Sequence, residues 1–209
     1  MTASTNVPTP PALLTTDPRP LYFRALAWVS GLAAAVPDEH LADPTPCDEF
    51  DVRTLLAHLV TTVRRPASIA AGTDPMAHEL VSADVLDDPA PAYVAEAAAL
   101  RDAFTGPTGD ALLDRVAQLP FGEVPGRAAL WAFLNETLVH GWDLAVATGQ
   151  GPEAEPDLAA AALEAARAYL PAERRGGPIP FGPVVEPAPG AGPTERLANW
   201  SGRERPAAG

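Results

Sequence analysis

The sequence predicts an all-α protein, namely an antiparallel four-helix bundle with an extra C-terminal helix and a Pro/Gly-rich tail. Apolar residues recur at three- and four-residue spacing in several segments, which is the period of an amphipathic helix. The 25 prolines gather in the N-terminal segment, in the connections and after Pro171, so they bound the helical segments and leave their interiors largely intact. Apart from a short extended piece expected at residues 181–185, no segment shows the alternation of apolar and polar residues that is typical of a half-buried strand.

The individual helices follow from their apolar stripes and their end signals. Asp17 and Pro18 form a helix start signal, and Pro37 ends the first helix. Asp51 is the expected N-cap of the second helix, which precedes a polar, Asp-rich loop at residues 72–90. The other predicted helices, together with the first, cover about residues 21–36, 92–104, 110–119, 127–147 and 157–170.

The chain divides into three parts. Residues 1–17 are expected to form a flexible leader, residues 18–175 the helical bundle, and residues 176–209 a Pro/Gly-rich tail that packs on the bundle. The length of 209 residues suits one domain. The N-terminus has no basic segment followed by an apolar block, so we expect no secretory signal.

Composition and charge narrow the class of function. The formal net charge of −13 argues against nucleic acid as a partner, because phosphate binding needs clustered basic residues, and it also disfavours anionic membranes. No apolar run approaches the ~18–20 residues of a membrane span. The single cysteine, Cys47, excludes an internal disulfide framework and fits a reducing cytoplasm. Small molecules are the expected partners, and a homodimer is compatible with a bundle of this size, although no segment identifies an interface.

The pair Glu136 and His140 is the most informative feature of the chain. The two residues stand four positions apart in a predicted helix, so their side chains lie on one face and suit a divalent transition metal. His58 flanks the apolar stripe of the second helix in the same way, and the three together predict one metal site shared by two helices. Spacing alone leaves structural alternatives open. These are an i, i+4 hydrogen bond or ion pair for Glu136 and His140, and a satisfied core histidine for His58.

Longer motifs around these residues resemble the mycothiol-dependent maleylpyruvate isomerase family, which belongs to the DinB/YfiT-like metalloprotein superfamily. The resemblance spans about residues 20–205, and its tail is similar to that of short, single-domain actinobacterial members. The matching stretches are PTPCDEFDVRTLLAHL at 44–59, NETLVHGWDLA at 135–145 with ATGQ at 147–150, and a looser tail of FGPVVEP at 181–187, TERL at 194–197 and GR at 202–203.

The resemblance implies a metal, usually zinc, held by His58, Glu136 and His140. Three protein ligands leave an open position, which is the arrangement of catalytic zinc sites. In such families this position commonly takes a low-molecular-weight thiol such as mycothiol. The implied activity is that of a thiol-dependent transferase or isomerase in which zinc, or another divalent transition metal, activates the thiol. A non-catalytic metal-binding protein and a metal-dependent hydrolase with the same three ligands are the alternatives.

Five further residues are candidates for roles near this site. Asp143 is a candidate acceptor for a ligand imidazole, with a capping or interhelix contact near the helix end as its alternative. Asn135 is a candidate hydrogen-bonding neighbour, with a surface position as its alternative. Arg64 and Arg65 are candidates to bind a carboxylate of a thiol cofactor or substrate, or else they are solvated cations near the helix end. Cys47 precedes the second helix at a position that the family motif often fills with cysteine. We expect a structural role for it, against the alternatives of a nucleophile and a fourth metal ligand.

Overall fold

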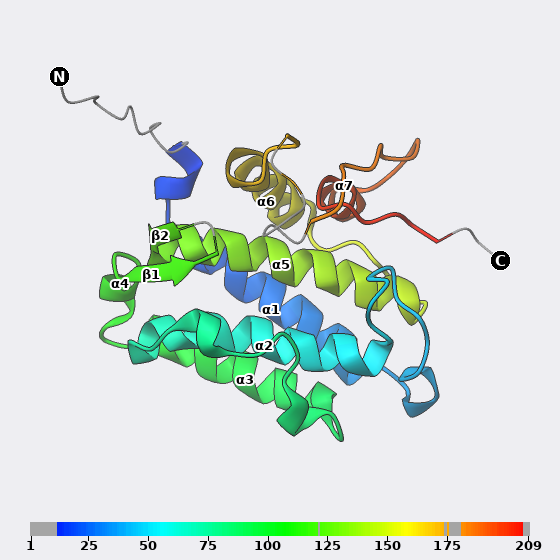
Figure 1. Cartoon of the computed structure of the whole chain (residues 1–209), viewed down its shortest axis with the longest axis horizontal. Coiled ribbons are helices and arrows are strands. Elements are labelled where there is room, and N and C mark those ends of the chain that lie inside the picture. Colours follow the sequence, from blue (N-terminus) through cyan, green and yellow to red (C-terminus); the bar gives the residue numbers. More distant parts are fainter. Residues whose placement is uncertain (1–11, 121, 174, 176–180, 207–209) are drawn as a thin grey trace.

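The computed structural model describes residues 12–120, 122–173, 175 and 181–206, and its regular structure is helical apart from one short β-hairpin (Figure 1). The all-α prediction is therefore confirmed. The elements are, in chain order, η1 (Ala12–Thr15), α1 (Arg19–Ala34), η2 (Asp38–His40), α2 (Val52–Ala71), η3 (Pro75–Ala77), η4 (Ala83–Val85), α3 (Pro89–Thr105), α4 (Gly109–Leu112), β1 (Val116–Leu119), β2 (Gly122–Pro125), α5 (Gly126–Ala147), α6 (Pro156–Tyr169) and α7 (Pro193–Trp200).

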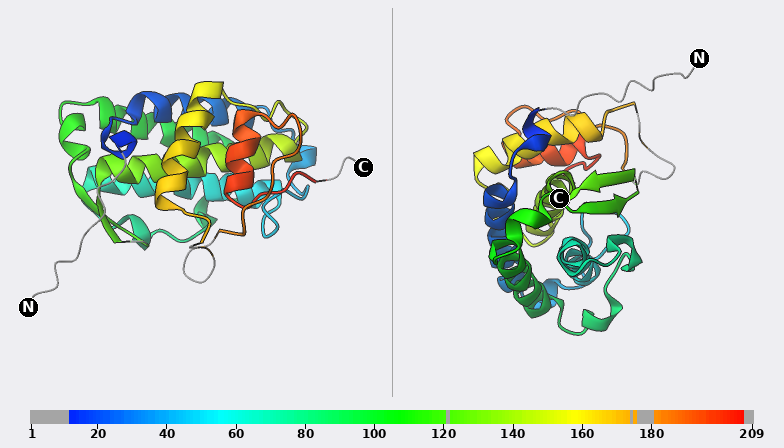
Figure 2. Two further views of the ribbon diagram at one scale, coloured as in Figure 1. Left: turned by 90° about the horizontal axis from the view of Figure 1, so that it is seen from above. Right: turned by 90° about the vertical axis from the view of Figure 1, so that its left-hand side faces the viewer.

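Four long helices form the bundle. Both α1 and α2 pack against α3 and α5, so the four surround a common apolar core. The helices α6 and α7 pack on each other and cover the side of α5 that faces away from the bundle (Figures 1 and 2). This covering explains why α5 is apolar around most of its circumference, since a helix that is buried on all sides needs no polar face. Every helix in the described part of the chain is too short or too polar to span a lipid bilayer.

The direction of the helices follows from contacts at their ends. Helices α1 and α5 run parallel, because Arg127 at the start of α5 donates to the carbonyl of Thr15, just before α1 (3.0 Å). Arg115, beside the start of α5, donates to the carbonyl of Ile69 at the end of α2 (2.8 Å), so α2 and α5 run antiparallel. The pair α1 and α3 is antiparallel as well, whereas α2 and α3 are parallel (Figure 1). The connection at 72–88 therefore has to run back along the length of α2.

Two local predictions are wrong. The segment predicted as a helix at 110–119 is helical only through Leu112, and its second half forms β1, which pairs antiparallel with β2. The chain reverses there at Gly122, which has a φ of 122°. The tail contains the helix α7, which was not predicted because prolines and glycines surround it. Pro193 stands in its first turn, where a missing N–H costs nothing.

The chain termini lie partly outside the described residues. This holds for residues 1–11 of the predicted leader and for residues 176–180 and 207–209 of the predicted tail. The described part of the leader forms η1, which contacts α5 and α6. Asp17 accepts a hydrogen bond from the N–H of Arg19 (3.0 Å). Helix α1 begins at Arg19, one position later than Pro18, which the start signal predicts as the first helical residue.

Gly141 allows α1 and α5 to approach closely beside the predicted metal site. A Cβ at this position would overlap the ring of Trp28 and the side chain of Val29, both on α1. Gly31 on α1 offers a matched comparison, because it is exposed and a Cβ there would meet open space.

We expect Gly141→Ala to lower the free energy of unfolding by about 1–3 kcal/mol, because the added methyl group overpacks this contact. Gly31→Ala should raise it by about 0.5–1 kcal/mol through higher helix propensity. Urea denaturation of the two variants beside the wild type measures both effects. Wild-type stability of Gly141→Ala would contradict the close packing of α1 on α5.

Candidate metal centre

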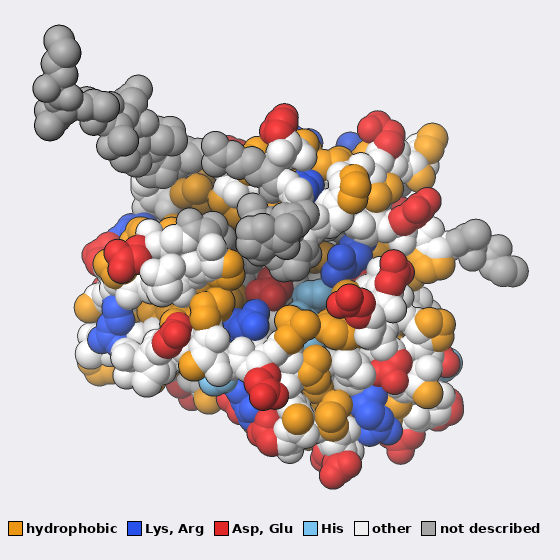
Figure 3. Space-filling view, viewed as in Figure 1, with side chains coloured by type: hydrophobic (Ala, Val, Ile, Leu, Met, Phe, Trp, Pro, Cys, Tyr) orange, Lys and Arg blue, Asp and Glu red, His pale blue; other side chains and the backbone are white. Residues whose placement is uncertain are grey.

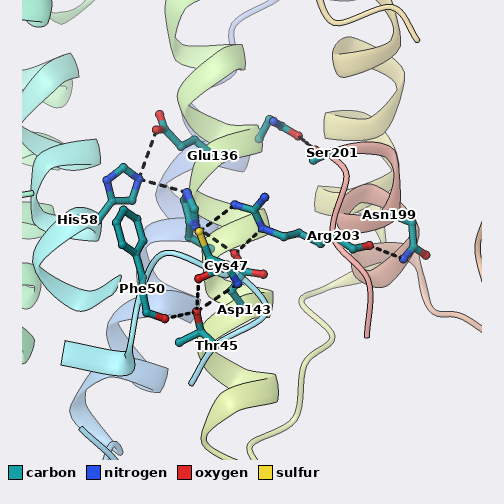
Figure 4. Close-up of polar contacts among 11 residues, drawn as sticks. Thr45, Cys47, Phe50, His58, Glu136, Asp143, Asn199, Ser201 and Arg203 are labelled. Carbon is teal, nitrogen blue, oxygen red and sulfur yellow. Dashed lines mark hydrogen bonds and ion pairs between the residues drawn. The ribbon is translucent and has the colours of Figure 1, made fainter. Parts of the chain in front are cut away.

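The structure brings the three predicted ligands together between α2 and α5 (Figure 4). His58 Nε2 lies 3.2 Å from His140 Nε2 and 3.7 Å from Glu136 Oε1. One donor atom from each residue lies within 4.8 Å of the other two. His58 stands in the first half of α2, Glu136 at the middle of α5 and His140 in its second half, so the antiparallel course of these helices sets the three residues level.

Hydrogen bonds determine which nitrogen of each imidazole carries the proton. His58 Nδ1 lies 2.6 Å from the carbonyl oxygen of Leu80, and His140 Nδ1 lies 3.0 Å from Asp143 Oδ2. Carbonyl and carboxylate oxygens only accept, so Nδ1 is the donor in both rings. In the neutral tautomers, the two Nε2 atoms therefore direct their lone pairs into the same space.

Both imidazoles are buried, with exposed fractions of 3% for His58 and 7% for His140. Burial, together with the neighbouring ring of His140, lowers the pKa of His58 to about 3. His58 is therefore neutral at physiological pH, which is the form in which histidine binds metals. Phe50 packs against its ring, with 5.2 Å between the ring centroids.

Polar contacts extend from His140 to the C-terminal segment (Figure 4). The oxygen of Asp143 that accepts from His140 also accepts from Arg203 Nε (3.0 Å). Arg203 Nη2 in turn donates to Cys47 Sγ (3.3 Å). Burial is the largest single influence on Arg203 and disfavours its charged form, but the combined effects of Asp143, Cys47 and Asp48 outweigh it and raise the pKa of the guanidinium. Asp143 is thus an acceptor behind a predicted ligand, and its own charge is balanced.

Cys47 lines the cavity at this site from the loop before α2, which hydrogen bonds of Thr45 hold in place. The hydroxyl of Thr45 donates to the carbonyl of Phe50 (2.8 Å) and accepts from the N–H of Cys47 (3.1 Å). The predicted cap residue Asp51 accepts from the N–H of the third residue of α2 (2.8 Å), which confirms the capping prediction. Burial raises the pKa of the Cys47 thiol to about 11, so it is protonated at neutral pH and is a poor nucleophile.

Cys47 also forms a second group of possible ligands with His140 and Asp143. This group is less suited to a cation, because Arg203 already lies against both the carboxylate and the sulfur. A guanidinium in that position repels a metal ion. The group of His58, Glu136 and His140 is therefore the better candidate.

A cavity of about 250 Å³ opens onto the three predicted ligands. Figure 3 shows histidine surface near the centre of this face of the molecule, with charged and hydrophobic side chains around it. The side chain of Glu136 is 24% exposed, so solvent and small molecules reach the group. The apolar lining includes Phe50, Met76, Leu119, Val139, Leu170 and Phe181.

The structure separates the two arginines that were considered for anion binding. Arg65 lines the cavity, with Nη1 3.9 Å from Glu136 Oε1, and its buried Nε has no hydrogen-bond partner within the described part of the chain. Arg64 lies outside the cavity lining and pairs with Asp84 (2.8 Å) and Glu96 (3.0 Å). Only Arg65 is thus brought to the predicted site.

Asn135 is buried and lines the cavity, which excludes the surface position considered for it. Its Oδ1 accepts from the hydroxyl of Ser201 at 3.4 Å. Two contacts of the site were not predicted from the sequence. They are the ion pair of Arg203 with the buried Asp143 and the hydrogen bond from His58 to the carbonyl of Leu80. The available signal for Arg203 is that a carboxylate in an apolar helix needs a cation. A backbone carbonyl leaves no signal in the sequence.

Comparison with known proteins places the chain in a family. Residues 23–145 match the family model described as mycothiol maleylpyruvate isomerase N-terminal domain. The chain belongs to this family. The matched range contains all three predicted ligands, whereas Arg203 lies outside it.

Two proteins of Mycobacterium tuberculosis are similar to nearly the whole chain. They are Uncharacterized protein Rv0738 of strain H37Rv and Uncharacterized protein MT0763 of strain CDC 1551. Each is 34% identical over 191 residues, which cover 90% of this chain and 98% of the relative. The similarity therefore extends beyond the family domain into the C-terminal segment. No solved structure matches the chain significantly.

We expect the metal-free protein to lose stability as the pH falls below about 6.5. The unfolded chain protonates His58 there, whereas the native pKa of about 3 keeps the buried ring neutral. This one proton lowers the free energy of unfolding by at most about 1.4 kcal/mol per pH unit between the two pKa values. Urea denaturation with EDTA at pH 7, 6 and 5 measures the slope. The slope should be smaller by about one proton in His58→Gln, and equal slopes would contradict a buried neutral ring.

Proposed function

We propose that the protein binds one divalent transition-metal ion, zinc by the chemistry of its donors, through His58, Glu136 and His140. We further propose that it is a thiol-dependent transferase or isomerase. Membership of a family whose name includes mycothiol supports a low-molecular-weight thiol of this type as co-substrate. Two imidazoles and one carboxylate form a common donor set of catalytic zinc.

The facing Nε2 atoms of the two imidazoles carry the metal proposal. Lone pairs that face each other at 3.2 Å inside a protein are unfavourable unless an electropositive centre lies between them. Two ligands of one tetrahedral zinc stand ~3.3 Å apart, since each bond is about 2.0–2.1 Å long. The separation of the two nitrogens therefore suits a shared ion, and Glu136 lies beside them as a third donor.

The cavity supports small-molecule chemistry at this position. Three protein donors leave room for an exogenous ligand on the cavity side. Bound zinc would lower the pKa of a thiol that it coordinates, so that the thiolate is present at neutral pH. The apolar walls suit the hydrocarbon part of an electrophile. Arg65 lies 3.9 Å from Glu136 through Nη1, and its Nε has no hydrogen-bond partner among the described residues, so we propose it as the group that binds a carboxylate on that electrophile.

A reducing environment is part of this proposal. A thiol co-substrate and the free Cys47 beside it are both maintained where thiols stay reduced. We therefore propose a cytoplasmic location for the protein.

Metal content tests the first part of the proposal. Protein purified without a metal-affinity column should contain about one zinc per chain by elemental analysis. His140→Ala and Glu136→Ala should lose it, because two remaining donors rarely hold zinc tightly. His78→Ala is the matched control, since its partner is Ser68, outside the cluster, and it should keep the metal.

Cys47→Ser separates the two groups of possible ligands and should also keep the metal. Loss of zinc in this variant would assign the ion to the group with Asp143. Stoichiometric zinc in His140→Ala would overturn the proposed ligand set. A folded wild type that binds no added zinc would mean that the two imidazoles share a proton.

Alkylation of mycothiol tests the second part. Zinc-loaded protein should accelerate thioether formation from mycothiol and a small electrophile, with release of the leaving group as iodide. Iodoacetate and iodoacetamide form a matched pair, because they differ in one negative charge. Arg65→Met should lower kcat/KM for iodoacetate relative to iodoacetamide by about 10-fold or more, the value of a lost charged hydrogen bond.

Arg64→Met is the control and should leave that ratio unchanged, because Arg64 pairs with carboxylates outside the cavity. Equal effects of the two arginine variants would exclude Arg65 as the anion-binding group. Zinc binding without any acceleration of thiol consumption would leave a non-catalytic metal-binding protein.

A further inference from the structure

Arg203 reaches the candidate metal centre from a part of the chain outside the family domain. Its side chain is only 18% exposed and lines the cavity. It donates from Nε to Asp143 Oδ2 (3.0 Å) and from Nη2 to Cys47 Sγ (3.3 Å). One guanidinium thus joins α5, the loop before α2 and the segment that follows α7 (Figure 4).

The backbone around Arg203 holds this side chain in place. Gly202 has a φ of 88°, the left-handed conformation that ends helices, and the N–H of Arg203 donates back to the carbonyl of Ala198 in α7 (2.9 Å). The side-chain amide of Asn199 donates to the carbonyl of Arg203 (3.0 Å). A Cβ at position 202 would overlap the backbone of Gly182. The turn at Gly202 therefore packs tightly against the irregular segment that precedes α7.

Asp143 depends on this cation. The carboxylate is fully buried, and an unpaired buried charge is strongly unfavourable. Its Oδ1 has no hydrogen-bond partner among the described residues, so the group is held through Oδ2 alone. Among the described residues, Arg203 and the imidazole N–H of His140 are the two donors to that oxygen.

We propose that Arg203 is a positioning residue of the metal centre, which holds the Asp143 carboxylate in the orientation that fixes the ring of His140. The proposal rests on the proposed metal site. An acceptor behind a ligating imidazole fixes its tautomer and ring orientation, and such contacts are worth about 10–100-fold in metal affinity. The C-terminal segment is then part of the site, although all three ligands lie within residues 23–145.

The test measures the zinc dissociation constant by competition with a chromophoric chelator, on full-length variants shown to be folded by circular dichroism. Arg203→Met should weaken zinc binding by about 10–100-fold. Arg203→Lys keeps the charge but cannot reproduce the two directed hydrogen bonds, so it should weaken binding by about 3–10-fold. If Arg203→Met does not fold, the zinc affinity of Arg203→Lys still tests the proposal.

Arg205→Met is the matched control from the same segment. Arg205 pairs with Glu195 (2.7 Å) and stacks over Trp142, with 5.4 Å to the ring centroid, and it does not line the cavity. Its removal should leave the zinc dissociation constant within about 2-fold of the wild type, because it touches neither the carboxylate nor a ligand.

A double-mutant cycle distinguishes positioning from general stabilisation. In an Asp143→Asn background, Arg203→Met should change zinc affinity by less than about 3-fold, because the residue through which it acts is already altered. Wild-type affinity in Arg203→Met, or the same loss in both backgrounds, would overturn the proposal while the metal site stands. A wild type that binds no zinc would overturn the metal site itself, and this inference with it.

Discussion

The alignment of α2 with α5 is the constraint on which the rest of the structure depends. Each helix carries ionisable side chains into an otherwise apolar interface, where a polar group has to find a partner within the protein. Their antiparallel course sets one imidazole opposite the other and places Glu136 beside them, and all three residues line the cavity. A shift of either helix by one turn, about 5.4 Å, would separate these groups and leave each of them unsatisfied. The packing of Gly141 against α1 limits such a shift.

The candidate centre is built in layers that come from increasingly distant parts of the chain. The two helices supply the donor atoms, and the crossover between α2 and α3 supplies the carbonyl that orients one ring. The loop before α2 contributes Phe50 and Cys47 as walls, and the segment after α7 contributes the balancing cation. The overall charge of −13 contrasts with the cavity, whose lining carries two arginines, Arg65 and Arg203, beside two glutamates, Glu49 and Glu136.

Local patterns were sufficient for the features that depend on neighbours in the sequence. Helical periodicity located the long helices, the cap at Asp51 is confirmed, and the four-residue spacing of Glu136 and His140 predicted a shared face. Features that depend on distant segments were not predictable in this way. Nothing near Arg203 indicates a buried carboxylate sixty residues earlier in the chain, at Asp143. The short strands of the hairpin are too brief for alternation to be visible, and α7 is helical because it packs on α5 and α6 despite its surroundings of glycine and proline.

The partner of His58 on the crossover is a main-chain atom, so the contact does not depend on which side chain stands there. The side chain of Leu80 is 52% exposed, while its carbonyl points inward to the imidazole. Any residue with the same backbone conformation presents the same oxygen. A substitution at position 80 therefore leaves this hydrogen bond in place, whereas an insertion or deletion in the crossover would move the carbonyl away from the imidazole. Relatives that share the chemistry are expected to agree more closely in the length and path of the crossover between α2 and α3 than in its amino-acid residues.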